Sequence, residues 1–230
     1  ALPEPGGMLR VGIPEYRLPK KVLRQEIGYI QKLGVEIKTS VQVGKDITLE
    51  KLKKDYDAVF VGVGAHGGMK LGVEGEDVHG IMEGIGFLRA VSLGGKVNVG
   101  KKVAVIGGGN TAIDCARTAS RLGAKEVTIV YRRSRAEMPA AEEEVTAAER
   151  EGIKIELLTT PARFSAENKK LAKMECVRMK LGEPDASGRP RPIPVKGSEF
   201  TIPVDTVIAA LGQAPETDFV KKLGVSVSKR

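Results

Sequence analysis

The sequence predicts an α/β fold, and three observations support this prediction. Apolar runs of strand length recur along the chain, as in residues 56–63 (YDAVFVGV) and 102–106 (KVAVI). Segments with apolar residues at helical spacing lie between such runs, and glycines end several of these segments. Strands that alternate with helices in this way are typical of a parallel sheet covered by helices.

Composition and charge are those of an ordinary globular protein and exclude several partners. With 230 residues, the chain is long enough for one large domain or two small ones. The net charge of +8 is spread along the chain, as on a solvated surface, although an anionic cofactor or an acidic protein partner stays open. Aromatic residues make up 4%, too few for a binder of single-stranded nucleic acid. No apolar run approaches the roughly 20 residues of a membrane helix, so we expect neither nucleic acid nor a membrane as a partner.

The two cysteines, Cys115 and Cys176, are far apart and form no CxxC pair. We therefore expect neither a structural zinc site nor a redox-active disulfide, and we expect a cytoplasmic location. The chain begins at Ala1 without an initiator Met, and no signal peptide is visible. We expect it to be an internal fragment of a longer protein.

The first part of the chain predicts a few short elements. Residues 1–18 are rich in glycine and proline and predict no regular element. Apolar spacing, stop glycines and strand-length apolar runs predict the following: helices from 19 to 33, 48 to 54 and 82 to 93, and strands at 35–37 and 56–63. A polar bridge at 96–100 is the predicted domain boundary.

The second part predicts a more regular alternation. Residues 102–106, 111–122 and 126–131 read as a buried strand, a helix and a second strand, which together form one βαβ unit. A helix at 139–151 and a strand at 153–158 follow. The remaining predicted elements are an antiparallel ribbon of 173–181 with 199–204, and a final buried strand at 205–211.

A glycine-rich turn lies between the strand 102–106 and the helix after it. It reads Gly107-x-Gly109-x-x-Ala112, the fingerprint of a Rossmann-type dinucleotide-binding domain in the strand and helix context that this motif requires. Gly107 permits the tight turn, Gly109 lets a pyrophosphate approach the backbone, and Ala112 lets helix and strand pack closely. Free N–H groups around Asn110 and Thr111 would hold the phosphates. The alternative is a glycine-rich turn without a ligand.

The end of the second strand indicates which dinucleotide is bound. Enzymes that use NAD usually carry Asp or Glu there, on the ribose 2′-hydroxyl. This chain has Arg132 and Arg133 instead, followed by Ser134, and a guanidinium group matches the geometry of phosphate oxygens. The sequence therefore predicts NADPH as the cofactor, and the alternative is that both arginines are solvated loop residues.

Gly212 ends the strand 205–211 at the edge of the sheet where ligands bind in open α/β folds, so we expect it to face the nicotinamide. A simple turn at the end of the strand is an equally good interpretation.

The acidic run 142–144 lies near a helix N-terminus, where carboxylates favour the helix dipole. His66 and His79 have no partner at ligand or triad spacing. We predict no catalytic side chain and no metal site.

Four blocks of sequence resemble the small (beta) subunit of glutamate synthase and its relatives. Related modules occur in dihydropyrimidine dehydrogenase and in NADPH:ferredoxin oxidoreductase subunits. The blocks, which cover almost the entire chain, are residues 6–20 (GGMLRVGIPEYRLPK), 105–118 (VIGGGNTAIDCART), 127–144 (VTIVYRRSRAEMPAAEEE) and 175–216 (ECVRMK to QAPE).

This resemblance implies a flavoprotein with two dinucleotide-binding domains, in which a NADPH domain is inserted into a FAD domain behind an iron–sulfur domain. Carried onto this chain, it implies that residues 1–95 form part of the FAD domain, 96–213 form the NADPH domain, and 214–230 begin the return to the FAD domain. The glycine fingerprint for FAD would precede Ala1, so the FAD site is incomplete here, and the iron–sulfur clusters would also lie before Ala1.

The implied activity is hydride transfer between NADPH and FAD, with electrons exchanged with the iron–sulfur clusters of the intact enzyme. The implied partner is a larger subunit or an acidic electron carrier such as ferredoxin. Hydride transfer between nicotinamide and flavin requires positioning and no side-chain acid or base. The alternative is an isolated nucleotide-binding fragment without catalytic activity.

Overall fold

The computed structural model describes residues 1–186, 188–215 and 217–228. The chain divides into two compact units, one formed by Gly68–Gly212 and the other by Ala1–Gly67 together with Gln213–Arg230. One unit is thus inserted in the sequence of the other. No helix in the described ranges is both long enough and apolar enough to cross a membrane.

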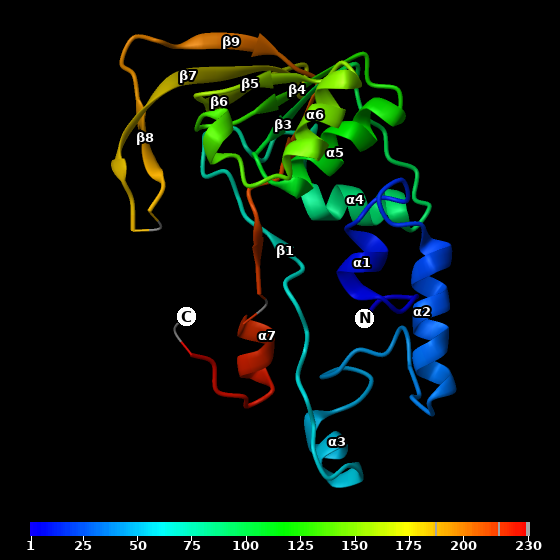
Figure 1. Cartoon of the computed structure of the whole chain (residues 1–230). Coiled ribbons are helices and arrows are strands. Elements are labelled where there is room, and N and C mark those ends of the chain that lie inside the picture. The colour runs from blue at the N-terminus through cyan, green and yellow to red at the C-terminus, as the bar shows by residue number, and fades with distance from the viewer. Residues whose placement is uncertain (187, 216, 229–230) are drawn as a thin grey trace. The chain divides into compact units, whose positions relative to one another are not determined.

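A five-stranded sheet forms the centre of the unit Gly68–Gly212 (Figure 1). Its spatial order is β2-β10-β3-β4-β5, and every neighbouring pair runs parallel. The predicted α/β class is therefore confirmed. The strands are β2 (Ile81–Glu83), β3 (Lys102–Ile106), β4 (Glu126–Val130), β5 (Lys154–Glu156) and β10 (Thr206–Ala209).

Helices cover one face of this sheet because alternate residues of its strands are apolar on that side. Val103 and Val105 of β3 belong to the same buried cluster as Ile113 of the following helix and Val145 of the helix after it. Burial of this cluster holds the helices on the sheet. The helices are α4 (Gly84–Ser92), α5 (Asn110–Arg121) and α6 (Glu142–Arg150), with a short 3₁₀ turn, η1 (Arg135–Glu137).

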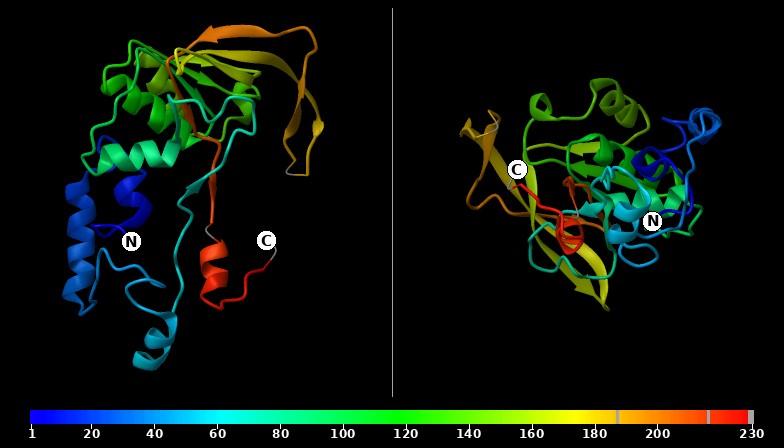
Figure 2. Two further views of the ribbon diagram at one scale, coloured as in Figure 1. Left: turned by 180° about the vertical axis from the view of Figure 1, so that it is seen from behind. Right: turned by 90° about the horizontal axis from the view of Figure 1, so that it is seen from below.

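An antiparallel sheet covers the opposite face (Figures 1 and 2). The other residues of β3, Ala104 and Ile106, pack there with Phe164 and Met174 of the antiparallel strands. The unit is thus a three-layer structure of helices, parallel sheet and antiparallel sheet. The antiparallel strands are β6 (Thr159–Glu167), β7 (Lys170–Pro184), β8 (Pro190–Pro194) and β9 (Phe200–Pro203).

The other unit is built from short helices and extended segments. Thr48 caps the helix that follows it, because its Oγ1 accepts a hydrogen bond of 3.1 Å from the Lys51 backbone N–H. The elements are α1 (Gly7–Val11), α2 (Lys20–Lys32), α3 (Leu49–Asp55) and α7 (Thr217–Lys222), with the paired segments β1 (Gly67–Gly68) and β11 (Gln213–Ala214) at the unit boundary.

Three predictions for this unit are wrong. Residues 1–18 contain a helix, α1, where no element was expected, and the expected strand at 35–37 is irregular. The apolar run 56–63 is also irregular, and its Phe60 is 95% exposed. A strand exists only where a neighbour satisfies its backbone N–H and C=O groups, and no described residue forms a ladder with this run.

The inserted unit follows its predictions more closely, although its first boundary differs. The predicted βαβ unit is confirmed as β3, α5 and β4, and the ribbon of β7 with β9 is confirmed. Strands β6 and β8 were not predicted. The structural unit begins at Gly68, whereas the sequence predicts a boundary at 95/96, because residues 68–95 supply β2 to the sheet and α4 to its helical layer.

Candidate nucleotide-binding site

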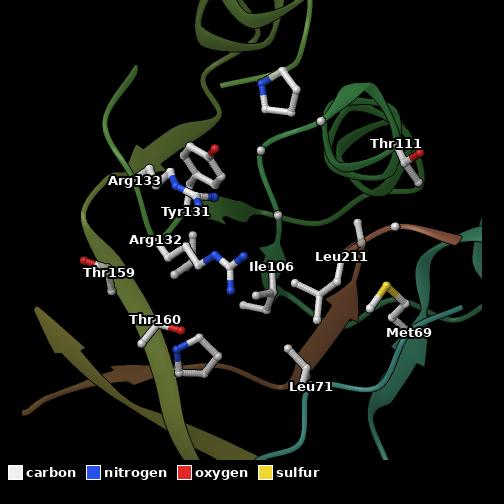
Figure 3. A pocket seen from close by; sticks show the side chains of 18 of the residues that line it. Met69, Leu71, Ile106, Thr111, Tyr131, Arg132, Arg133, Thr159, Thr160 and Leu211 are labelled. Carbon is white, nitrogen blue, oxygen red and sulfur yellow. The ribbon is translucent and has the colours of Figure 1, made fainter. Parts of the chain in front are cut away.

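A cavity of about 460 Å³ opens at the carboxyl ends of β3, β4 and β10 (Figure 3). The topology explains its position. From β3 the chain continues through α5 to β4 on one side, whereas β10 returns to pair with the other side of β3. Ligands of open α/β sheets bind where the strand order reverses in this way. All lining residues belong to the unit Gly68–Gly212.

Gly107 begins the turn that forms the floor of this cavity. Its φ of +146° strongly favours glycine, and a Cβ at this position would lie 2.3 Å from the Ala210 carbonyl oxygen. Its N–H donates to the Val130 carbonyl over 3.0 Å. Ala112 is fully buried, and its Cβ would lie 3.4 Å from a Cβ on Gly107. The first glycine and the alanine of the motif therefore serve close packing among β3, β4, β10 and α5.

Gly109 meets a different requirement. Its backbone is extended, and a Cβ there would have Pro139 Cγ as its nearest neighbour, at an ordinary 3.7 Å. The protein's own packing therefore tolerates a side chain at this position. Gly109 is the N-cap residue of α5 and has no side chain to cap the helix, so no capping side chain competes with an anion for the helix N-terminus. A pyrophosphate that approaches the turn would need glycine here.

Asn110 and Thr111 form the first turn of α5. The Asn110 side chain accepts a hydrogen bond of 3.0 Å from the Ala141 backbone N–H, and the Gly108 carbonyl accepts one of 3.2 Å from Ala140. These bonds hold the approach to α6 against the glycine turn. Thr111 lines the cavity. The side chain of Asn110 thus shapes the turn through a contact within the protein.

The residues after β4 have three different environments. The Arg132 side chain is exposed and extends into the cavity, near Thr160 (Figure 3). Arg133 is 3% exposed and also borders the cavity. Its guanidinium group donates over 2.8 Å to the Pro190 carbonyl oxygen and over 2.8 Å to Asp185 Oδ2.

The Ser134 hydroxyl is hydrogen-bonded within the protein. Its Oγ donates to Glu137 Oε2 over 2.7 Å, and its backbone N–H donates to the same oxygen over 3.0 Å, which together form a capping box for η1. Of the three polar residues that the sequence places at this position, Arg132 presents its charge to the cavity most directly.

The end of the cavity next to β10 is mainly apolar, although Lys70 also lines the cavity. Gly212 lines it with a φ of +129°, and a Cβ there would lie 3.6 Å from Met69 Sδ. Leu71 and Leu211 complete this end (Figure 3). The cavity therefore combines a cationic end after β4, a row of backbone amides at the glycine turn and an apolar end after β10.

Sequence reasoning missed several lining residues. Met69 and Leu71 precede β2, and Thr160 belongs to the unpredicted β6. Arg189 lines the cavity from the turn between β7 and β8. These residues are distant in sequence from the glycine turn. Only the rule that ligands bind at the carboxyl edge of the sheet could have indicated some of them in advance.

The acidic run 142–144 serves ion pairs between helices. Glu142 pairs with Arg135 at 2.7 Å, and Glu144 pairs with Arg117 of α5. In the part of the chain that the structure describes, no group of three or more His, Cys, Asp or Glu side chains is placed to hold a metal ion.

Both cysteines are buried and unbridged. Burial raises the pKa of the Cys115 thiol well above its ordinary value, and burial raises the pKa of Cys176 to about 12. Both are therefore protonated near neutral pH, so neither is a ready nucleophile or thiolate ligand.

Comparison with known sequences finds relatives whose names include NADPH or NADP(+). It is 52% identical over 236 residues to the NADPH-Fe(3+) oxidoreductase subunit beta of Geobacter sulfurreducens, covering 100% of this chain and 35% of that protein. It is 52% identical over 223 residues to the NADP(+)-dependent formate dehydrogenase subunit beta of Moorella thermoacetica, covering 96% and 32%. It is 40% identical over 225 residues to the glutamate synthase [NADPH] small chain of Escherichia coli, covering 93% and 48%. The chain thus spans about a third to a half of the length of these relatives.

Comparison with solved structures confirms the predicted fold class. FprA from Mycobacterium tuberculosis, solved in complex with NADPH, aligns with a TM-score of 0.73 at 20% identity, over 93% of this chain and 63% of that one. Thioredoxin reductase from T. acidophilum aligns with a TM-score of 0.51 at 23% identity, over 71% and 47%. The predicted resemblance to the glutamate synthase small chain is also confirmed. A family model described as pyridine nucleotide-disulphide oxidoreductase matches residues 5–230, and the chain belongs to that family.

Proposed function

We propose that the cavity of the unit Gly68–Gly212 binds NADPH. The observation that carries this proposal is a glycine turn at a helix N-terminus that opens into a cavity with Arg132 at its far side. The amides around Gly109 would bind the pyrophosphate, aided by the positive end of the α5 dipole. The guanidinium group of Arg132 would bind the adenosine 2′-phosphate. The names of three relatives, which include NADPH or NADP(+), support this choice of nucleotide.

The apolar end of the cavity would receive the nicotinamide. Met69, Leu71 and Leu211 offer it apolar surface, and Gly212 leaves its face uncovered. Such an environment orients the ring and excludes water, which is what hydride transfer requires of a protein. Hydride transfer itself requires no side-chain acid or base. Besides the arginines, the charged or titratable side chains among the described lining residues are Lys70 and Tyr131, and the Tyr131 hydroxyl donates to the Glu137 carbonyl over 2.6 Å.

In the longer proteins that this chain resembles, the hydride acceptor would be FAD, and electrons would then pass to iron–sulfur clusters. Outside 102–121, the described residues place no turn of the G-x-G-x-x-G/A type between a strand and a helix, which is what a FAD pyrophosphate would need. We therefore assign NADPH binding to this chain and leave the flavin contacts to the intact protein. Two of the relatives are beta subunits, which supports a larger partner subunit.

An isolated nucleotide-binding module without activity is the second candidate, and the same incomplete FAD site favours it. Both candidates require the same cofactor preference. They separate when NADPH oxidation is measured in the longer protein that supplies the flavin site, because a functional hydride-transfer module turns over there.

The test of NADPH binding is a calorimetric titration of the 230-residue chain with NADPH and with NADH. We expect NADPH to bind at least tenfold more tightly, because a charge-assisted hydrogen bond contributes about 1.5–3 kcal/mol and 1.4 kcal/mol is a factor of ten. Arg132→Gln should remove most of that preference and leave NADH binding within about twofold.

The matched control is Arg150→Gln, which removes an exposed arginine at the end of α6 that does not line the cavity. It should leave both affinities unchanged. Equal binding of the two nucleotides by the unaltered chain would refute the assignment of Arg132, and failure to bind either would refute the site.

A further inference from the structure

The turn between β7 and β8 brings a second arginine to the cationic end of the cavity. Arg189 lines the same cavity as Arg132, although 57 positions separate them in the sequence. The Asp185 N–H donates to the Arg189 carbonyl over 2.8 Å, and the Gly188 N–H donates to the Asp185 carbonyl over 2.8 Å. These two bonds fix the backbone of Arg189 next to that of Asp185 at the end of the ribbon.

Arg133 ties this turn to the end of β4. Its Nε donates to the carbonyl of Pro190, the residue directly after Arg189, and its Nη2 donates to the Asp185 carboxylate, each over 2.8 Å. The guanidinium group therefore forms hydrogen bonds to the turn on both sides of Arg189. The Arg133 side chain is 3% exposed and the Asp185 side chain 32%, so this charge-assisted pairing is partly shielded from water and holds the turn more firmly than a fully exposed ion pair would.

Arg133 also immediately follows Arg132 in the chain. It therefore links the segment that presents Arg132 to the turn that presents Arg189. A phosphate monoester carries close to two negative charges and three acceptor oxygens, so two guanidinium groups from different segments satisfy it better than one.

We propose that Arg189 is a second ligand of the adenosine 2′-phosphate and that Arg133 is a positioning residue that holds Arg189 in place. This inference rests on the proposed binding of NADPH. Of the two arginines after β4, Arg132 would then bind the phosphate, and Arg133 would orient Arg189 toward it.

The first test compares Arg189→Gln with Arg191→Gln. Arg191 is exposed, carries the same charge and lies two residues further along the same ribbon, but it does not line the cavity. In calorimetric titrations, Arg189→Gln should raise the Kd for NADPH about tenfold and leave the Kd for NADH within about twofold. Arg191→Gln should leave both within about twofold. Equal effects of the two substitutions on NADPH would overturn the role of Arg189.

The second test is Asp185→Asn. A pure charge effect and a positioning effect predict opposite changes in NADPH affinity for this variant. Removing a carboxylate near an anion site strengthens phosphate binding if only the local charge matters. Loss of the Arg133 anchor weakens it if the turn must be held. We expect NADPH binding to weaken severalfold, with NADH binding and the melting temperature nearly unchanged. Tighter NADPH binding would overturn the positioning role.

The double variant Asp185→Asn with Arg189→Gln completes a thermodynamic cycle. If Asp185 acts through Arg189, the double variant binds NADPH no more weakly than Arg189→Gln alone. Additive losses would overturn the coupling between them. A titration with 2′,5′-ADP, which lacks the nicotinamide, should repeat each result and place the effect at the phosphate end.

The outcomes separate this inference from the proposed function. If the unaltered chain prefers NADPH and Arg132→Gln abolishes the preference while Arg189→Gln behaves as Arg191→Gln does, the inference fails and NADPH binding stands. If the unaltered chain shows no preference for NADPH, both fail.

Discussion

Gly107 and Gly109 lie two residues apart in one turn, yet glycine serves a different purpose at each. Gly107 has a left-handed backbone and lies against the Ala210 carbonyl, so the fold itself requires it. Gly109 has ordinary backbone angles and room for a side chain, so only a ligand would require it. A motif read as one functional unit thus contains one position for structure and one for binding.

Substitution at these two glycines should separate stability from binding. Gly107→Ala should lower the free energy of unfolding by about 2 kcal/mol or more, because strain and a contact of 2.3 Å add at that position. Gly109→Val should keep the melting temperature within a few degrees and abolish NADPH binding, because the side chain would fill the pyrophosphate position. Thermal unfolding and calorimetric titration measure the two effects. A folded Gly109→Val variant that binds NADPH would show that the phosphates lie elsewhere.

At the scale of elements, ion pairs hold α5 and α6 together beside the site. Arg117 of α5 pairs with Glu151 at 2.8 Å and also with Glu144. Arg121 pairs with Glu151 at 2.7 Å. Burial acts to raise the pKa of Glu151, but hydrogen bonds from Arg121 and Arg117 lower it below its ordinary value of 4.5. The helix whose N-terminus faces the cavity is therefore braced at its far end by a shared carboxylate.

Loss of this carboxylate should lower stability in a pH-dependent way. Glu151→Gln should reduce the free energy of unfolding at pH 7 by about 1 kcal/mol, the upper range for an exposed pair, because two arginines share the group. The folded-state pKa lies below the unfolded value, so the stabilisation is present above pH 4.5 and is lost as the pH falls through the folded-state pKa. Urea unfolding at several pH values measures it.

Glu167→Gln is the matched control, since it removes an exposed carboxylate on β6. It should change stability little at any pH. A deficit in Glu151→Gln that stayed constant down to pH 3 would argue against the ion pairs as its cause.

At the scale of the whole molecule, the inserted unit holds the candidate nucleotide site, and the described residues of the other unit hold no glycine fingerprint of this kind. The cavity is lined only by residues of Gly68–Gly212. A flavin pyrophosphate would need a second glycine turn between a strand and a helix, and the described part of the other unit contains no such turn.

We therefore expect the purified 230-residue chain to lack flavin absorbance and to show no NADPH-driven reduction of an artificial acceptor. Contacts to the FAD phosphates and hydrogen bonds to its ribose would both be missing, and the contacts that remain would bind FAD only weakly. A visible absorption spectrum and a dye-reduction assay test this. A yellow protein would mean that the unit built from 1–67 and 213–230 supplies more of a flavin site than its described elements indicate.

The sequence predicted the sheet unit well because local pattern and tertiary burial agree there. The apolar run 102–106 has neighbours on both sides, so its residues form the expected buried strand, β3. The run 56–63 is also largely apolar but has no neighbouring strand among the described residues, and pattern alone cannot reveal whether a neighbour exists. Strand β8 escaped prediction because prolines begin and end it, and they normally argue against a strand.

The candidate site was predictable only where sequence neighbours are also neighbours in space. The glycine turn and Arg132 follow from the spacing within one βαβ unit. Arg189 reaches the cavity from a turn in the antiparallel layer, and the burial of Arg133 against that turn depends on how β7 is placed on the parallel sheet. Such contacts arise from tertiary packing and leave no short-range signal.

The pairing of Gly67–Gly68 with Gln213–Ala214 means that the chain leaves the host unit and returns to it on two adjacent, hydrogen-bonded segments. An inserted unit whose ends are neighbours can be replaced as a whole by another, because the two segments on either side of the insertion already lie next to each other. The same adjacency would allow the ends of residues 68–212 to be joined by a short linker and new termini to be opened at an exposed loop. Nucleotide preference could thus be altered by replacing one contiguous stretch of a gene, without touching the residues on either side of it.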